Sequence, residues 1–265
     1  PETHLRMPLA DYAFVAASIA PRHFADATAA VRRVREIKSE AEIDRIRAAC
    51  RTADAAFARV PDLAGDGRTT AEVSRAFQSA LLEAGADWVG YLAVGAGQGG
   101  YADVISPPDA RPLREGDVLM LDAEAVRDGH FCDFDRNYAI GLPDDAVRRT
   151  HASLHVATDA ALSELRPGMT AREVHALMAG HLAARGATPA AGRFGHGLGL
   201  ALTEWPSFTP KDETVLRAGM VLALEPSAEV SPGRILVHEE NVVLRADRAE
   251  LLSARAPTDL PVLAP

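Results

Sequence analysis

Two segments of this 265-residue chain occur twice, in the same order and at nearly the same spacing. Residues 70–86 resemble 170–187, and residues 113–122 resemble 216–225. A single match between helix caps or apolar strands would be weak, but two in one order favour two structurally similar halves. This repeat constrains the fold more than any single motif does.

Each half is predicted to contain two helices followed by a β-hairpin. Capping-box patterns, in which Glu follows Ser or Thr by three residues, begin three of the helices, at Ser39, Thr69 and Thr170. The first helix should end before Pro61, and Asp128-Gly129 is a strong signal for a two-residue hairpin turn. The expected elements are helices over 39–60, 69–84, 144–165 and 170–185, strands over 88–94, 117–126, 130–140, 219–225 and 235–245, and a loop-rich segment over 95–116.

Composition excludes several classes of partner. Lys and Arg total 28 and Asp and Glu total 37, so the formal net charge of −9 argues against nucleic acid or an anionic membrane. Two cysteines, Cys50 and Cys132, are too few for a disulfide scaffold and suit a thiolate metal site poorly. No apolar run is long enough to cross a membrane and no signal peptide opens the chain, so we expect a cytoplasmic protein.

Acidic residues stand where the strands should be apolar. The repeat places Asp122 and Glu225 at equivalent ends of apolar strands. Around a turn at Asp128-Gly129, Asp122 faces Asp135 and Glu124 faces Asp133, and all four side chains share one face of the hairpin. A solvated polar face is one interpretation. A divalent cation is the other, and it resolves the mutual repulsion better than water does.

A histidine and a further glutamate complete this hypothesis. His196 stands between Gly195 and Gly197, whose small size allows close approach, although a lone histidine is more often structural than a metal ligand. Glu239 or Glu240, just before an apolar run, should share a face with the site of Glu225. Oxygen ligands with one imidazole suit Mn, Fe, Co or Zn.

In this order, the residues resemble the pita-bread metallohydrolases, which include methionine aminopeptidase, aminopeptidase P and prolidase, with creatinase as a metal-free relative. The resemblance covers roughly residues 35–250, and 35–39 is similar to the start of the catalytic domain in the aminopeptidase P and prolidase branch. It implies an α/β pita-bread fold with two pseudo-symmetric helix-helix-hairpin halves around a shared curved antiparallel sheet. Residues 1–34 would be a linker or the remnant of an N-terminal domain, 35–265 the catalytic domain, and the assembly a homodimer.

The resemblance also implies a centre with two divalent metal ions (Mn, Co, Fe or Zn) that activates water to attack a peptide-like amide of a small molecule or short peptide. Glu225 or Glu204 would accept the proton of that water, with Thr203 nearby. Glu239 fits the family's last strand better than Glu240 does. The implied ligands are Asp122, Asp133, His196, Glu225 and Glu239, of which Asp133 and Glu239 would bridge the ions.

The chain departs from the family pattern in three respects. Glu124 stands where the family usually has Gly and Asp135 where it usually has Thr, so the site carries extra negative charge. Thr203-Glu204 replaces a His-Glu pair, and the stretch 103–107 lacks another usual histidine. Two alternatives to a peptidase therefore stay open: a lyase or small-amide hydrolase on the same fold, favoured by the lost histidines, and a catalytically silent binding scaffold, disfavoured by the intact ligands.

Overall fold

The computed structural model describes residues 7–105 and 107–264, and the chain divides into two compact units at Arg35/Glu36. In the first unit lie α1 (Leu9–Ser18) and most of α2 (Thr28–Glu36), and the Tyr12 ring stacks on Phe24 with centroids 5.2 Å apart. The interpretation of 1–34 as a linker or domain remnant stays a prediction. Within the described residues, no helix is long and apolar enough to cross a membrane.

The second unit contains the two halves that the repeat predicts. The first half consists of α3 (Glu40–Phe57), α4 (Val60–Leu63), α5 (Thr70–Glu83), β1 (Trp88–Gln98), β2 (Asp117–Arg127), β3 (His130–Phe131) and β4 (Phe134–Ile140). The second half and the end of the chain consist of α6 (Asp145–Glu164), α7 (Ala171–Ala184), β5 (Gly195–Gly197), β6 (Glu204–Ser207), β7 (Val221–Leu224), β8 (Ser227–Ser231), β9 (Arg234–Val237), β10 (Glu240–Leu244), β11 (Ala249–Leu251) and β12 (Val262–Leu263).

Local signals explain where these elements begin and end. All three capping boxes are present, at Ser39, Thr69 and Thr170. The expectation that the first helix runs up to Pro61 is wrong: α3 ends at Phe57, and Pro61 lies in the first turn of α4, where its missing N–H costs nothing. The strand predicted over 88–94 continues to residue 98 as β1, into the segment expected to be loop.

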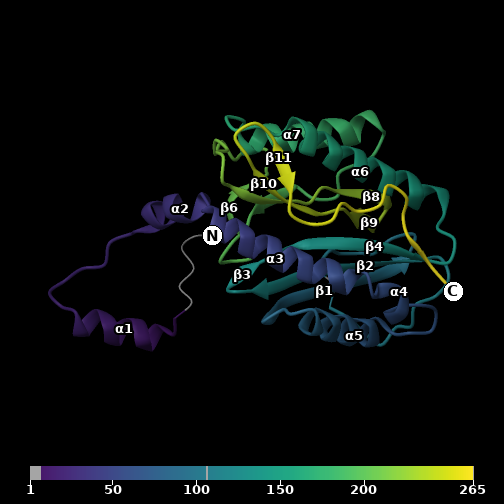
Figure 1. Cartoon of the computed structure of the whole chain (residues 1–265), viewed down its shortest axis with the longest axis horizontal. Coiled ribbons are helices and arrows are strands. Elements are labelled where there is room, and N and C mark those ends of the chain that lie inside the picture. The colour runs from purple at the N-terminus through teal and green to yellow at the C-terminus, as the bar shows by residue number, and fades with distance from the viewer. Residues whose placement is uncertain (1–6, 106, 265) are drawn as a thin grey trace. The chain divides into compact units, whose positions relative to one another are not determined.

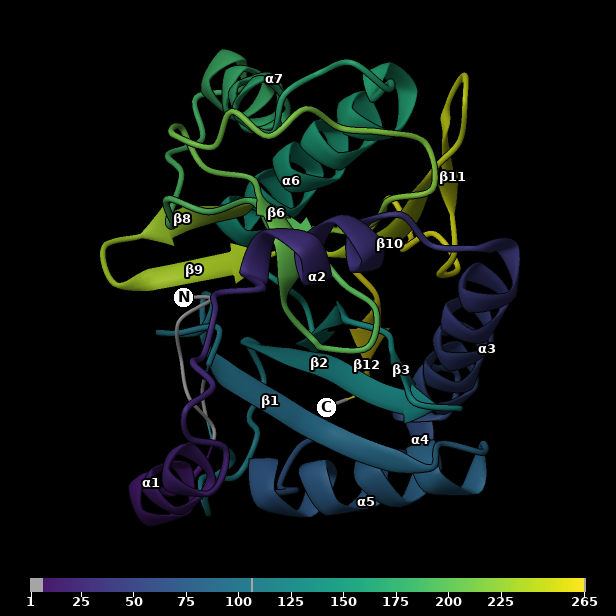
Figure 2. The same cartoon turned by 90° about the vertical axis from the view of Figure 1, so that its left-hand side faces the viewer.

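Hydrogen bonds divide the strands of this unit into one five-stranded sheet for each half (Figures 1 and 2). The first has the order β1-β2-β4-β12 with β3 on β2, and the second has the order β11-β10-β7-β5-β6; β8 and β9 pair separately. Helices α3 and α5 pack against β2 and β1, and α6 packs against β8 and β11 with α7 beside it. The hairpins are thus held between two layers of helices.

The first hairpin has the predicted register. Asp122 is paired with Asp135, and Asp128 and Gly129 form the turn with φ of 49° and 74°. The strand opposite β2 is interrupted at 132–133, between β3 and β4, but the register is the same on both sides of the interruption. Glu124 therefore faces Asp133 across it.

The second hairpin repeats this arrangement. Leu224 of β7 pairs with Glu240 of β10, so Glu225 and Glu239 follow and precede these strands at facing positions. The strand predicted over 235–245 is interrupted at 238–239, which separates β9 from β10. Glu239 therefore lies on irregular backbone between two strands.

Two asparagines at equivalent positions join the halves. Asn137 Nδ2 donates to the Val237 carbonyl at 2.8 Å, and Asn241 Nδ2 donates to the Asp133 carbonyl. The Asp133 N–H donates in turn to Asn241 Oδ1 at 2.9 Å. Each hairpin thus fixes backbone of the other, at the end of β9 and at Asp133, and Asp133 is a predicted metal ligand.

We expect Asn241→Ala to lower the free energy of unfolding by roughly 2–4 kcal/mol, because the buried backbone N–H and C=O of Asp133 both lose their partner. Urea unfolding of the metal-free variant and wild type measures the difference. A change within about 0.5 kcal/mol, the range of ordinary surface substitutions, would contradict this role.

Candidate metal centre

The predicted ligands meet in one cavity of about 410 Å³ between the two hairpins. Asp122, Asp133, His196, Glu225 and Glu239 all line it. Glu124 lines it as well, and Tyr91, Val104, Ile105 and Leu202 contribute an apolar wall. The sequence pattern therefore predicts a set of residues that the fold brings together from β2, the β3–β4 junction, β5 and the ends of β7 and β10.

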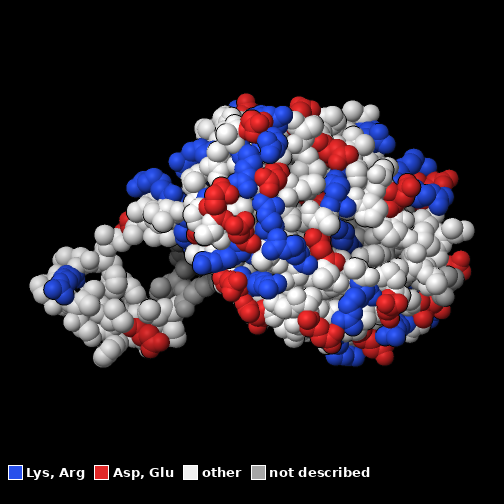
Figure 3. Space-filling model, in the orientation of Figure 1, with Lys and Arg blue, Asp and Glu red and all other residues white. Residues whose placement is uncertain are grey.

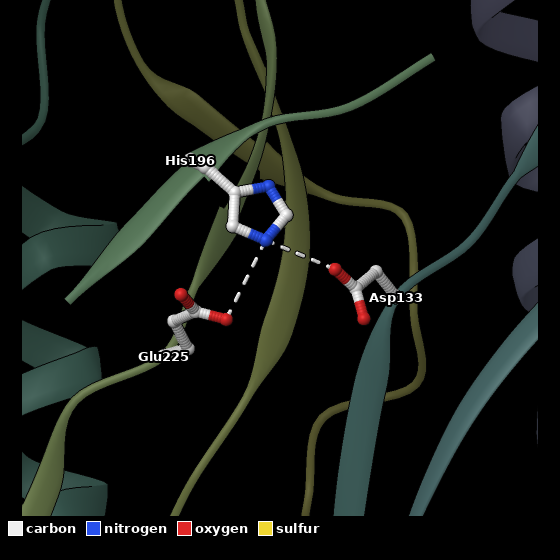
Figure 4. A group of neighbouring side chains, drawn as sticks. All are labelled: Asp133, His196 and Glu225. Carbon is white, nitrogen blue, oxygen red and sulfur yellow. Dashed lines mark ion pairs between the residues drawn. The ribbon is translucent and has the colours of Figure 1, made fainter. Parts of the chain in front are cut away.

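His196 is the centre of this group (Figure 4). Its Nε2 lies 3.1 Å from Asp133 Oδ2 and 3.6 Å from Glu225 Oε2, and its Nδ1 lies 2.9 Å from the Gly197 carbonyl. The hydrogen bond to that carbonyl assigns the proton of the neutral ring to Nδ1. The lone pair of Nε2 then faces the carboxylates, as in a metal-binding histidine.

The glycines beside His196 are required by the backbone around it. A Cβ at Gly195 would lie 2.2 Å from the Ala223 carbonyl oxygen, and one at Gly197 would lie 2.0 Å from the Trp205 carbonyl oxygen. Gly195 also has φ of +143°. This confirms the expectation that small residues here allow close approach, and the close approach brings β5 near β7 and β6.

Unpartnered oxygen atoms indicate that this group fits a cation. Asp122 Oδ1 and Glu239 Oε2 are buried without a hydrogen-bond partner, and Glu239 is only 4% exposed. Ligand atoms of Asp133, His196 and Glu225 lie within 4.8 Å of one another, as do those of Asp122, Glu124 and Asp133. Buried carboxylate oxygens without a donor are costly, so the cluster is able to hold metal and a bound cation would stabilise it.

The electrostatics of the metal-free site show the same need for positive charge. Burial alone would lower the pKa of His196, but Glu225 and Asp133 outweigh it and raise this pKa to about 9. Burial and the Asp133 carboxylate raise the pKa of Glu124 to about 8 and that of Asp122 well above its ordinary value. Without metal, protons therefore neutralise the site.

Glu239 and Glu240 have different surroundings, which distinguish the predicted ligand from its neighbour. Asp135 Oδ1 accepts the Glu239 N–H at 2.6 Å, and Arg136 Nη1 donates to the Glu239 carbonyl at 2.9 Å. Arg136 Nη2 also lies 3.1 Å from Glu240 Oε2, which Ser253 contacts as well. Asp135 and Arg136 line a second cavity of about 250 Å³. They support the backbone of Glu239, whose side chain lines the first cavity, whereas the side chain of Glu240 forms ion pairs away from it.

Two residues given catalytic roles by the resemblance lie differently. Thr203 lines the cavity, whereas the carboxylate of Glu204 accepts a hydrogen bond from Lys38 Nζ at 3.0 Å in a buried ion pair and does not line it. Val104 and Ile105 line the cavity in the stretch without the usual histidine, and Ser106 lies outside the described residues. The structure thus places Thr203, and not Glu204, beside the cluster.

Arg193 is a residue at this cavity that the sequence reasoning missed. Its Nε lies 3.0 Å from Glu225 Oε1, and its side chain is 43% exposed. The only signal for it was its position three residues before His196, which by itself indicates no contact with Glu225.

The profile of metallopeptidase family M24 matches residues 44–246, most of the second unit. The chain belongs to metallopeptidase family M24. This confirms the resemblance drawn from the ordered carboxylates and His196.

Individual M24 proteins are similar over nearly the whole chain. The probable dipeptidase PepE of Mycobacterium tuberculosis (strain ATCC 25618 / H37Rv) is 35% identical over 239 residues, which are 89% of this chain and 63% of that protein. The structure of dipeptidase PepE from Mycobacterium ulcerans has a TM-score of 0.88 at 32% identity, covering 98% of this chain and 70% of that one. The X-Pro aminopeptidase of Thermotoga maritima has a TM-score of 0.89 at 24% identity, over 97% and 72% of the two chains. The pita-bread fold is therefore confirmed, and the chain spans less than two thirds of the length of the curated PepE relatives.

We expect the metal-free M24 protein to lose stability as pH rises from about 4.5 to about 9. Between the ordinary pKa of 4.5 and about 8, Glu124 holds a proton when folded that it loses when unfolded, so rising pH favours unfolding. The stabilising charge of His196, whose pKa is raised from 6.5 to about 9, is lost in the same direction. A pKa that differs by about one between the folded and unfolded chain changes the free energy of unfolding by roughly 1.4 kcal/mol.

Urea midpoints of the chelated protein between pH 5 and pH 9, with and without added Mn²⁺, test this expectation. Metal should reverse the trend, because binding needs deprotonated ligands and strengthens as pH rises. Equal midpoints across the range in the chelated protein would instead favour a solvated polar face.

Proposed function

We propose that this chain hydrolyses short peptides, dipeptides above all, at a centre of two divalent metal ions. The observation that carries the proposal is the pair of buried, unpartnered oxygens of Asp122 and Glu239 in the same cavity as His196. The name of the similar protein from Mycobacterium tuberculosis, probable dipeptidase, supports a peptide substrate.

The five predicted ligands divide between two positions. Asp133, His196 and Glu225 offer one set of ligand atoms, and Asp122 with Asp133 belongs to the other. Asp133 is common to both, which supports its role as a bridging carboxylate, and Glu239 would be the second bridge, as the resemblance implies. Oxygen ligands with a single imidazole suit Mn, Co, Fe or Zn.

The chain's own residues account for the remaining steps. The metal ions would activate a water molecule and polarise the substrate carbonyl. Glu225 lines the cavity and is the better acceptor for the proton of that water, since Glu204 is occupied by Lys38. Thr203, which lines the cavity, would donate a hydrogen bond to the substrate, and Tyr91, Ile105 and Leu202 would provide an apolar wall for the substrate side chain.

The cavity and the surface support a small substrate. A volume of about 410 Å³ is at the small end of ligand sites and suits a molecule of dipeptide size. On the face of the second unit shown in Figure 3, acidic side chains lie beside the basic ones, including those in the band down the middle of this face. This distribution supports a small-molecule or short-peptide partner over nucleic acid. The homodimer and the cytoplasmic location stay predictions.

Metal content and peptide hydrolysis of Asp133→Asn test the proposal. Wild type should bind about two divalent ions per chain and hydrolyse dipeptides only when loaded. Asp133→Asn should lose at least one ion and its activity, because a bridging ligand serves both positions. Glu229→Gln, an exposed substitution on β8, controls for the change in charge. If wild type that has been supplied with divalent metal contained no ion, the proposal would be overturned.

Because Thr203 stands where the family usually has a histidine, we expect wild type to hydrolyse Xaa-Pro dipeptides only weakly. A threonine can donate a hydrogen bond but has no pKa near neutrality, and loss of general acid–base assistance typically costs about 10²–10⁴-fold in rate. We expect metal-loaded Thr203→His to hydrolyse an Xaa-Pro dipeptide faster than wild type in a steady-state assay. Wild-type turnover on the order of 10 per second would contradict this prediction.

A further inference from the structure

Glu124 is a sixth acidic or imidazole group in the cavity that the five-ligand set does not use. It lies on β2, is 6% exposed and lines the cavity. One of its carboxylate oxygens lies within 4.8 Å of ligand atoms of both Asp122 and Asp133. Because side chains alternate along a strand, Asp122 and Glu124 point to the same face of β2.

The basic side chains described around the cavity form ion pairs with carboxylates other than Glu124. Arg193 and His196 form ion pairs with Glu225, His196 also pairs with Asp133, and Lys38 pairs with Glu204. A carboxylate that is buried beside two others is stabilised mainly by a cation bound among all three. The buried Oδ1 of Asp122 has no hydrogen-bond partner, and the same cation would stabilise it.

We propose that Glu124 is an additional ligand for the metal ion held by Asp122 and Asp133. This inference rests on the metal centre of the proposed function. The two positions are chemically different, because one has His196 among its ligand atoms and the other has only carboxylate oxygens, to which Glu124 adds one. Hard cations such as Mn²⁺ or Mg²⁺ prefer oxygen ligands, whereas imidazole suits Zn²⁺, Fe²⁺ and Co²⁺.

The carboxylate of Glu124 changes the net charge of the metal-loaded centre. Asp122, Asp133, Glu225 and Glu239 balance the charge of two divalent ions, and Glu124 leaves the loaded centre with a net negative charge. A more negative centre holds its cations more tightly and favours a substrate that brings a positive group, such as a free amino terminus. Glu124 therefore tunes both metal retention and substrate choice.

Titration of the chelated protein with Mn²⁺ by calorimetry tests the proposal on wild type, Glu124→Gln and Glu124→Gly. Both substitutions remove a negative charge from a repulsive cluster, and circular dichroism of the metal-free variants checks their fold. Glu229→Gln, which removes an exposed charge from β8, is the matched control. The readout is the affinity of each position for Mn²⁺, which is independent of catalysis.

We expect Glu124→Gln and Glu124→Gly to weaken one Mn²⁺ position by more than the roughly 10–100-fold that loss of an outer-sphere partner costs, and to leave the other nearly unchanged. A smaller loss, or an equal loss at both positions, would overturn direct ligation by Glu124. If wild type bound no Mn²⁺, Zn²⁺ or Co²⁺ at all, the proposed function would fail as well. Two tight positions that are unaffected by the substitutions would overturn this inference alone.

Discussion

The fold buries several carboxylates around His196 that repel one another, and the rest of the structure has to hold them together. Asp122, Asp133, Glu225 and Glu239 line one cavity with Glu124, and His196 is the imidazole among them. Water would solvate these carboxylates and weaken their repulsion, but here apolar strands and two layers of helices exclude most of the solvent. Positive charge must therefore enter the cavity, as protons in the metal-free protein or as metal ions in the loaded one.

Holding this repulsive group together requires rigid backbone, which the two hairpins supply to each other. Asn241 fixes both backbone groups of Asp133, and Asp135 with Arg136 fixes the backbone of Glu239. Both fixed residues lie on irregular backbone where a strand is interrupted, so strand pairing alone would not hold them. The cost of the buried charges is thus offset by hydrogen bonds that cross between the halves, and a ligand from each half depends on the other.

Much of this arrangement could be predicted from the sequence, because it rests on short-range rules. The Asp128-Gly129 turn determines the register that places Asp122 opposite Asp135, and the capping boxes begin the helices correctly. Pairings between distant segments could not be read in the same way. Asp135 shares a face with Asp122 in the pattern, yet its carboxylate receives the Glu239 N–H instead of lining the cavity. Likewise, the ion pair of Glu204 with Lys38 joins segments whose contact no local pattern indicates.

The departures from the family pattern are related through charge. Replacement of a small residue by Glu124 adds an acid beside Asp122, and replacement of an imidazole by Thr203 removes a group that could carry positive charge near the same cavity. Glu124 makes the site more negative, and Thr203 cannot carry a positive charge to offset it. Arg193, paired with Glu225 and 43% exposed, is the described side chain that lines the cavity and brings permanent positive charge to it. Its ion pair with Glu225 therefore offsets part of the negative charge that Glu124 adds to the cavity.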